Sequence, residues 1–496
     1  MIYFMAVCKY LNYINGGLSM STTSKASQRI ASLLDENSFV EIGAKVTARA
    51  TDFNLNTVDT PSDGVVTGYG VINGNLVYVY AQDASVLGGS VGEMHAKKIA
   101  NLYDLAIKTG APIIGLIDSA GLRLEESFDA LNAFGEIYAA QANASGVIPQ
   151  ITAIFGSCGG GLSLIPTLTD FTFMEEKNAK LFVNSPNAIE GNTVEKCNTA
   201  SAQFQSEEAG TVDVVADEAT IFAQIRELIC MIPSNCDTDT SFIECEDDLN
   251  RACEGIENAV ADSSIAISMI ADDNAFFEVK AAYAKEMVTG FIKLNGATVG
   301  VVANRTAIYD EEGKEVEKFD NALSPKGCEK AADFVNFCDA FEIPVLTLTN
   351  VAGFKACKCA EKKLAKAAAK LTYVFANATV PSVNVVIGKA FGTAYSIMNS
   401  KALGADMTFA WDSAQIGMMD AKLAAKIICD GQGADAIDAC AKEYDALQNS
   451  VDAAAARGYV DTIIAPADTR KYLIGAFDML YTKAVDTVAK KHGAVL

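Results

Sequence analysis

Two glycine-rich stretches are the features of this sequence best suited to chemistry. Each follows an apolar run of strand length, and they read "DSAGLR" (118–123) and "FGSCGGGLS" (155–163). Glycine inside a regular element costs up to about 1 kcal/mol relative to alanine. Such clusters therefore indicate unusual backbone dihedrals or the close approach of another group. Tight packing of a strand against a helix would equally explain one or two of these glycines.

Backbone N–H groups in such loops can stabilise negative charge. Donors from two loops, one of them at the start of a helix, can converge on a single oxygen. The result is an oxyanion hole made without side chains, and glycine leaves room for a bulky thioester against the backbone. The sequence has only two histidines, His95 and His492, which disfavours a zinc site or a histidine-based triad. We therefore expect no metal.

The same pair of loops occurs a second time. The later copies read "TNVAGFK" (349–355) and "IGKAFGTAYSI" (387–397). The separation is 232 residues for both glycine pairs, Gly121 with Gly353 (353 − 121) and Gly156 with Gly388 (388 − 156). Flanking segments are also echoed, as "LLDENSFVEIGA" is by "IADDNAFFEVKA". The chain is therefore an internal duplication, and each half carries both loops.

The pattern along each half predicts the elements that position these loops. Short apolar runs alternate with amphipathic stretches such as 97–110 and 328–341, which is typical of an α/β fold. The acidic segment 233–248 is the best candidate for a linker. We expect domains at 20–240 and 241–496. Residues 1–19 are expected to be a non-native or disordered extension, because an ordinary start follows at Met20.

Composition narrows the setting. A net charge of −23 disfavours nucleic acid or an anionic membrane as a partner, and no apolar run reaches the ~18–20 residues needed to span a bilayer. The thirteen cysteines include no C-x-x-C pair and are expected to be reduced thiols. The "CKC" at 357–359 is the one close pair, with a metal role as the minor alternative. We expect a cytoplasmic protein, either free or peripheral to a membrane complex.

Several long motifs occur in order between about Ser32 and Leu480. They include "QDASVLGGSVGEMHAKKI", "SGVIPQITAIFGSCGGG" and "ATVPSVNVVIGKAFGTAYSIMNSKALGADMTFAW". With the glycine loops, these motifs resemble the carboxyltransferase subunits of biotin-dependent acyl-CoA carboxylases and decarboxylases. That group includes propionyl-CoA carboxylase beta chains and methylmalonyl-CoA decarboxylase alpha chains.

The resemblance implies a fold of two tandem crotonase-like domains of the ClpP/crotonase superfamily. The N-terminal domain would bind acyl-CoA and the C-terminal domain carboxybiotin, with each active site formed between two subunits of a homo-hexamer. The implied activity moves a carboxyl group between biotin and the α-carbon of a short-chain acyl-CoA, through enolates held in two oxyanion holes. The cofactor then supplies the base, so no catalytic histidine is needed.

The resemblance also implies partners and residues. Biotin would sit on a separate biotinyl carrier protein, because this chain has no A-M-K-M-like acceptor motif, and biotin carboxylase or membrane decarboxylase subunits would complete the complex. The catalytic amides carried over are those of Leu122, Gly160 and Gly161 on the CoA side and of Phe354, Thr393 and Ala394 on the biotin side. The substrate-binding positions are Ala120, Gly121, Arg123, Gly353, Gly392 and Ser396. Arg123 can equally pair with Glu125 or Glu126 to hold its loop. Ser396 stands where the family varies with acyl preference, which implies a small acyl chain.

The second half departs from the family pattern. Ala352 stands in place of the usual proline, Thr393 in place of a second glycine, and "KACKCAEKKLAKAAAK" (355–370) in place of a glycine-rich loop. The end of that segment predicts a surface helix, with attraction of anionic CoA or carboxybiotin by its lysines as the alternative. Two other functions stay open: a biotin-independent hydratase or isomerase using Glu125 or Glu126, and a non-catalytic CoA-binding assembly subunit.

Overall fold

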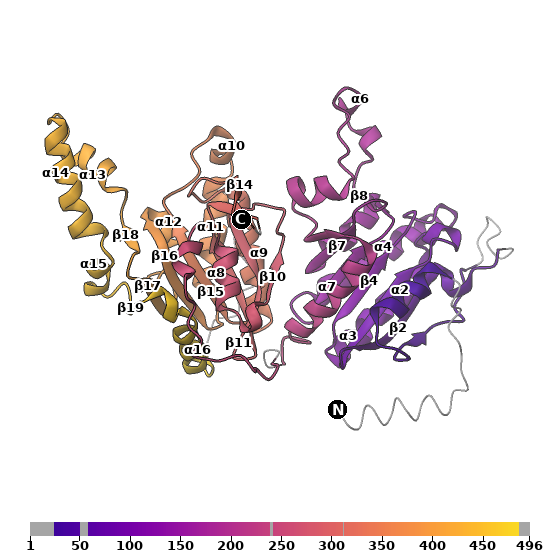
Figure 1. Cartoon of the computed structure of the whole chain (residues 1–496). Coiled ribbons are helices and arrows are strands. Elements are labelled where there is room, and N and C mark those ends of the chain that lie inside the picture. Colours follow the sequence, from indigo (N-terminus) through magenta and orange to yellow (C-terminus); the bar gives the residue numbers. More distant parts are fainter. Residues whose placement is uncertain (1–23, 50–57, 239–241, 311, 486–496) are drawn as a thin grey trace. The chain divides into compact units, whose positions relative to one another are not determined.

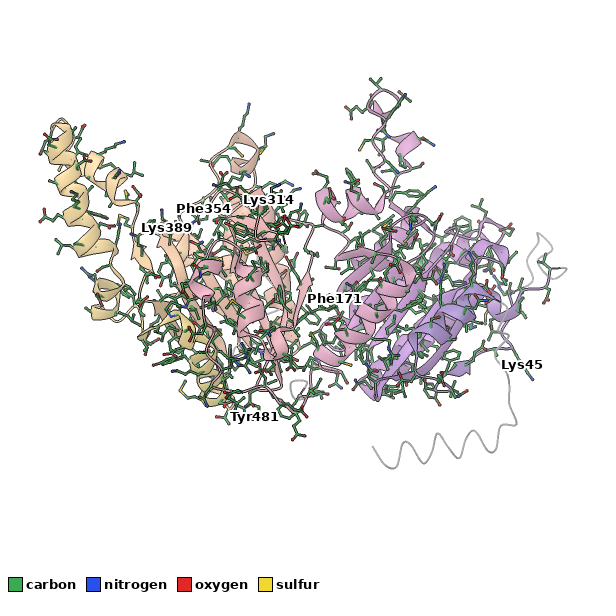
Figure 2. All side chains as sticks on the ribbon, viewed as in Figure 1. Lys45, Phe171, Lys314, Phe354, Lys389 and Tyr481 are labelled. Atoms are coloured by element: carbon green, nitrogen blue, oxygen red, sulfur yellow. The ribbon has the colours of Figure 1, made fainter. Side chains whose placement is uncertain are left out.

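The computed structural model describes residues 24–49, 58–238, 242–310 and 312–485 (Figures 1 and 2). The chain divides into two compact units, Met1–Thr238 and Asp239–Leu496. This boundary falls inside the acidic segment 233–248. The predicted extension 1–19 and the start at Met20 lie outside the described residues.

The N-terminal unit is built on a seven-stranded sheet. Its order is β1 (Val40–Ile42), β2 (Val65–Ile72), β3 (Asn75–Gln82), β4 (Ile113–Ile117), β5 (Gln150–Ile154), β7 (Phe171–Glu175) and β9 (Val214–Ala216). The first three strands pair antiparallel, and the strands from β3 to β9 pair parallel. Every residue of β4, β5 and β7 is buried, which explains why they read as continuous apolar runs. A small parallel pair, β6 (Ser157–Gly159) and β8 (Lys180–Phe182), lies beside this sheet in the chain order.

Helices cover this sheet. They are α2 (Lys25–Leu33), α3 (Glu93–Thr109), α4 (Phe128–Ala144), α5 (Leu164–Thr167), α6 (Asn192–Glu195) and α7 (Glu218–Met231). The ends follow ordinary capping chemistry: Ser24 caps α2, Asp217 caps α7, and α3 ends at Gly110, whose φ is 61°. The buried faces of α3 and α4 join the strands in one hydrophobic core.

The C-terminal unit repeats this plan with eight strands. The order is β10 (Phe276–Val279), β11 (Met287–Leu294), β12 (Ala297–Asn304), β15 (Val345–Val351), β16 (Ser382–Phe391), β17 (Met407–Trp411) and β19 (Thr462–Ile464), with β18 (Gln415–Gly417) also paired to β16. Again three antiparallel strands lead into a parallel series. A separate hairpin consists of β13 (Ala307–Tyr309) and β14 (Glu315–Lys318).

The helices of this unit are α8 (Ser263–Ile270), α9 (Pro325–Ala340), α10 (Lys358–Glu361), α11 (Leu364–Asn377), α12 (Gly392–Ser396), α13 (Ala421–Ile428), α14 (Ala434–Tyr444), α15 (Val451–Ala456) and α16 (Thr469–Leu480). The helix predicted in the altered segment forms as α11. It buries Ala367 and Leu371 while Lys366 faces solvent, so it is an amphipathic surface helix. No helix in the described part of the chain is long and apolar enough to cross a membrane.

A pair of buried lysines shows how closely the two units correspond. Lys98 in α3 donates to the carbonyls of Ser62 and Val65. Lys330, 232 residues later (330 − 98) in α9, donates to those of Lys280 and Tyr283. Burial lowers the pKa of Lys98 to about 8 and that of Lys330 to about 7. In each unit the lysine ties the helix to the backbone near the first long strand.

Candidate active site

In the N-terminal unit the two predicted glycine loops meet because they follow neighbouring parallel strands. Ile117 ends β4, Ile154 ends β5, and these two residues are paired in the sheet. The loops leave from the same edge and bond to each other directly: the N–H of Ser119 donates to the carbonyl of Ser157 at 3.1 Å. The first loop therefore lies against the second.

The backbone around Leu122 leaves one amide unused. Gly121 has a φ of 98°, a conformation that L side chains rarely adopt. Its carbonyl accepts from Val91 at 2.8 Å, and the N–H of Arg123 donates to the carbonyl of Val91 at 3.0 Å. These bonds flank Leu122, whose own N–H takes part in no hydrogen bond within the described residues. It is an available donor, as the sequence predicts.

The second loop supplies further amides. Gly160 has a φ of 62° and begins a short helical turn that ends at Ser163. The first N–H groups of such a turn have no partner within it. A Cβ at Gly161 would lie 3.1 Å from Tyr138 Oη, so this position is also crowded. The need for glycine at 160 and 161 thus has two separate causes, dihedral angle and space.

These turns line a pocket of about 680 Å³. Its walls are Ala120, Gly121, Leu122, Leu131, Phe134, Gly135, Tyr138, Gly159, Gly160, Gly161 and Phe182. An apolar wall with a few aimed polar groups is the usual character of a small-molecule site. The sequence prediction included Ala120 and the glycine-loop residues of this wall but missed the aromatic and aliphatic side chains.

The missed side chains come mostly from α4. Leu131, Phe134 and Tyr138 recur at spacings of three and four residues, so helical periodicity in the sequence could have placed them on one face. The Tyr138 hydroxyl donates to the carbonyl of Gly161 at 2.5 Å, and partial burial raises the pKa of this tyrosine. Tyr138 therefore fixes the second glycine turn.

Arg123 does not line the pocket. Its side chain is buried, with only 1 % of the residue exposed, between Asp63 Oδ1 at 2.6 Å and Glu126 Oε1 at 2.8 Å. It also donates to the carbonyl of Ser90 at 2.7 Å. The expectation that Arg123 binds substrate is corrected: the alternative, pairing with Glu126 to hold the loop, is what the structure shows.

The groups that could act as acids or bases near these loops are held elsewhere. His95 is fully buried between Asp63 and Gln82, and burial together with Arg123 lowers its pKa to about 3. Glu126 accepts from Arg123 and from the N–H of Glu93 at 2.6 Å. Glu125 is exposed. Neither glutamate nor this histidine is among the pocket-lining residues that the structure describes, which removes the candidates for hydratase chemistry.

The C-terminal unit forms the same turn. The N–H of Leu323 donates to Gly353 and the N–H of Lys355 donates back to Leu323, both at 2.9 Å. These bonds flank Phe354, labelled in Figure 2, and its N–H has no partner in the described parts of the chain. Gly392 begins α12 with a φ of 63°, within a degree of Gly160. The backbone geometry is therefore duplicated along with the sequence.

The correspondence between the two predicted sets shifts by one residue. The offset of 232 pairs Gly160 with Gly392 and Gly161 with Thr393, so the set of Thr393 and Ala394 begins one position later in its turn. Thr393 and Ser396 are exposed, whereas Ala394 is buried. The expectation that the duplication maps one set directly onto the other is corrected accordingly.

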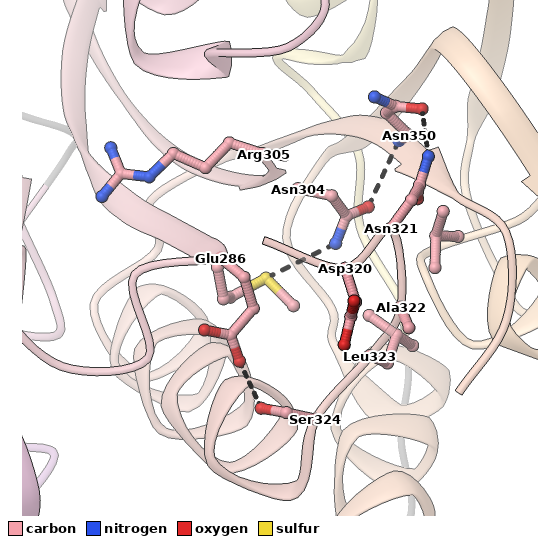
Figure 3. Close-up of a pocket in the computed structure, with 11 residues that line it drawn as sticks. Glu286, Asn304, Arg305, Asp320, Asn321, Ala322, Leu323, Ser324 and Asn350 are labelled. Carbon is pink, nitrogen blue, oxygen red and sulfur yellow. Dashed lines mark hydrogen bonds between the residues drawn. The ribbon is translucent and has the colours of Figure 1, made fainter. Parts of the chain in front are cut away.

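A small polar cavity lies behind the Phe354 turn (Figure 3). Its volume is about 10 Å³, room for about one water molecule. Asn350 links its walls, accepting from Asn321 Nδ2 at 3.1 Å and donating its N–H to Asn304 Oδ1 at 3.3 Å. Asn321 also accepts from the N–H of Ala352. This network positions the turn and is too small to hold a cofactor.

Two mixed α/β units that present backbone amides on paired glycine turns define a carboxyltransferase of the crotonase-like class. The chain belongs to the carboxyl transferase domain family, whose model matches residues 23–495. It is 39% identical to the propionyl-CoA carboxylase beta chain of Roseobacter denitrificans, over 94% of this chain and 92% of that one. It is 37% identical to the methylmalonyl-CoA decarboxylase subunit alpha of Propionigenium modestum, over 95% and 92%.

A solved structure gives the same answer. The transcarboxylase 12S hexamer with hydrolysed methylmalonyl-coenzyme A bound matches with a TM-score of 0.88 and 34% identity, covering 98% of this chain and 94% of that one. The predicted family and the α/β fold of crotonase-like type are confirmed, and the chain is an enzyme of the carboxyltransferase class.

Proposed function

We propose that the chain moves a carboxyl group between biotin and the α-carbon of a short-chain acyl-CoA, of acetyl, propionyl, malonyl or methylmalonyl size. One observation carries this proposal: the unused amide of Leu122 beside the Gly160 turn recurs as the unused amide of Phe354 beside the Gly392 turn. Two such sites suit a transfer between two partners that both develop negative charge on oxygen. A hydratase or isomerase needs only one.

The N-terminal pocket is the acyl-CoA side of the proposal. Its apolar wall can exclude water from the thioester, and glycine leaves the backbone accessible. Amides of Leu122, Gly160 and Gly161 would hold the thioester oxygen as charge develops on it, with Ala120 and Gly121 contacting the substrate. Such preorganised donors stabilise the charge because they need no reorientation during the reaction. A relative solved with methylmalonyl-coenzyme A supports a small acyl group, as Ser396 does.

The C-terminal turn is the biotin side. Biotin, when bound, supplies the carboxyl-carrying chemistry of the reaction. The amides of Phe354, Thr393 and Ala394 would hold its ureido oxygen, with Gly353 and Gly392 shaping the turn. The exposed Thr393 adds a Cβ to this surface and makes the site narrower than one with glycine. Lys355 and Lys358 are exposed in the following segment and provide positive charge for an anionic ligand.

The proposal extends to assembly and partners. The matched transcarboxylase 12S is a hexamer, which supports a homo-hexamer in which the N-terminal domain (20–240) of one subunit faces the C-terminal domain (241–496) of another. A separate biotinyl carrier protein would deliver the cofactor, because no acceptor motif occurs in this sequence. Biotin carboxylase or membrane decarboxylase subunits would complete a cytoplasmic complex, either free or peripheral to a membrane.

The test removes one donor from each site. Proline has no N–H, so Gly161→Pro and Ala394→Pro should each lower biotin-dependent carboxyl transfer by about 10²- to 10³-fold, the usual cost of one oxyanion donor. Ala394→Pro should still bind acyl-CoA normally. Gly161→Ala and Ala394→Gly keep their N–H groups and serve as controls, and thermal melting with light scattering checks folding and assembly. Full activity of an assembled Ala394→Pro protein would exclude the second site.

A further inference from the structure

Two cysteines stand just beyond the Phe354 turn. Cys357 and Cys359 have their Sγ atoms 3.1 Å apart; Cys357 is half-exposed and Cys359 exposed. They lie at the start of α10, which stands out from the sheet of the C-terminal unit in Figure 1. The pair is therefore close in space, open to solvent and next to one of the two proposed oxyanion sites.

The surroundings favour a reactive thiolate on Cys357. A hydrogen bond from Cys359, then the N–H of Ala360 and the charge of Lys355, lower the pKa of Cys357. The same Ala360 bond, at 3.4 Å, makes Cys357 Sγ the N-cap of α10. The thiolate is the nucleophilic form of cysteine. No group of three metal-binding side chains occurs in the part of the chain that the structure describes, so the pair lacks further ligands for an ion.

The other thiols of this chain are different. Burial raises the pKa of Cys158, Cys328 and Cys338, which makes them unreactive core groups. Cys440 hydrogen-bonds with Cys429, but there the bond and burial raise its pKa. Cys357 is thus set apart by accessibility, by a neighbouring thiol and by the direction of its pKa shift.

We propose that Cys357 and Cys359 form a reversible dithiol–disulfide switch that responds to low-molecular-weight disulfides such as oxidised glutathione. The Cys357 thiolate attacks one sulfur of oxidised glutathione, forming a mixed disulfide and releasing one glutathione thiolate. Cys359 loses its proton to water and attacks the Cys357 sulfur, which releases the second glutathione thiolate. Two protein thiols are oxidised and one glutathione disulfide is reduced, so atoms and electrons balance.

Closing the disulfide should change the Phe354 turn. The oxidised Cys357 sulfur no longer offers a thiolate to the Ala360 N–H, so α10 loses its N-cap. The segment 357–359 is also drawn together three residues after Phe354, whose position depends on the adjacent Lys355–Leu323 bond. This consequence rests on the proposed function: oxidation should impair the biotin side and leave the acyl-CoA pocket of the other unit intact.

The experiment equilibrates the full-length assembled protein across ratios of oxidised to reduced glutathione. Non-reducing peptide mapping by mass spectrometry should find a Cys357–Cys359 disulfide, two hydrogens lighter than the reduced peptide. Biotin-dependent carboxyl transfer should fall about 10²-fold as the Phe354 donor is displaced. Dithiothreitol should restore it, and acyl-CoA binding should not change.

Three variants sharpen the test. Cys357→Ser keeps a capping side chain, because serine is a preferred N-cap, and should stay active but insensitive to glutathione. Cys359→Ser should stop at the mixed disulfide and carry one glutathione. Cys197→Ser, which removes an exposed cysteine of the N-terminal unit, should respond like the unaltered protein.

Three results would overturn the switch. Both thiols could stay alkylatable at every glutathione ratio, the activity loss could track a Cys429–Cys440 disulfide, or the Cys357–Cys359 disulfide could form with activity unchanged. Absence of biotin-dependent transfer in the reduced protein would instead refute the proposed function. The mass of the 357–359 peptide would then still decide whether the dithiol oxidises, and free thiols there would refute the switch as well.

Discussion

The two units share a backbone plan but hold their functional turns in different ways. Arg123, after the N-terminal turn, is buried in an ion cluster with Asp63 and Glu126. Its counterpart 232 residues later is Lys355, which is exposed and leads into the segment with the cysteine pair. The flanking bonds around Leu122 and Phe354 are nevertheless the same. Duplication has therefore kept the geometry that presents an amide, while the side chains behind it have diverged.

A second difference concerns the acids that start the strands after each glycine loop. Asp170 and Asp406 accept the N–H of Gln150 and Ser382, respectively, both at 2.8 Å. Asp406 also pairs with Lys483 at 2.7 Å. Asp170 has no ion pair within the described residues. Burial, with the nearby charge of Asp213, raises its pKa to about 7. The same strand-start contact is thus made by a neutralised carboxylate in one unit and by a proton-binding one in the other.

The largest effect is expected from the ion cluster. Arg123→Met leaves Asp63 and Glu126 buried without their partner and should lower the free energy of unfolding by about 3–5 kcal/mol. Lys355→Met, the matched change at an exposed site, should alter it by less than about 0.5 kcal/mol. Chemical denaturation of both variants measures the difference. Equal effects would mean that the two turns are supported alike.

The next effect comes from the equivalent glycines Gly156 and Gly388. A Cβ would lie 1.9 Å from Asp118 Oδ1 at the first position and 2.6 Å from Asn350 Oδ1 at the second. Asp118 is also held by Arg29 at 3.0 Å and cannot easily move away. We expect Gly156→Ala to cost about 3 kcal/mol of stability and Gly388→Ala about 1 kcal/mol. Thermal melting compares them, and a larger cost at Gly388 would contradict this ranking.

The smallest effect is a difference in pH dependence. The pKa of Asp170 is raised from 3.8 to about 7 in the folded protein. The protonated form is therefore favoured by folding, and its contribution is complete below about pH 4 and is lost as the pH rises through about 7. Asp170→Asn should flatten this slope and stabilise the protein at about pH 8 by on the order of 2 kcal/mol.

The counterpart variant should have the opposite sign. Asp406→Asn removes the partner of Lys483 and should destabilise the protein by about 1 kcal/mol at the same pH. Denaturation followed at several pH values between about 4 and 8 tests both variants. A steep slope that persists in Asp170→Asn would assign the pH dependence to another group.

Much of the fold and of the two turns could be predicted from the chain alone, because the signals are local. A glycine at a positive φ, such as Gly121 or Gly392, is required by the dihedral angle of its own residue. Alternating apolar runs and amphipathic stretches reflect the periods of strands and helices. The offset of 232 residues then relates the two halves without any structure.

Other features depend on contacts between distant segments, which no local pattern encodes. Arg123 could have faced a ligand or a carboxylate, and only folding brings Asp63, 60 residues earlier, to 2.6 Å from it. Tyr138 joins the pocket because α4 packs across the second turn, and its hydroxyl reaches Gly161 only there. The proton affinity of Asp170 likewise arises from burial, which lowers the local dielectric and has no counterpart in the unfolded chain. Local backbone preferences thus specify where the amides point, whereas tertiary packing specifies which side chains hold them there.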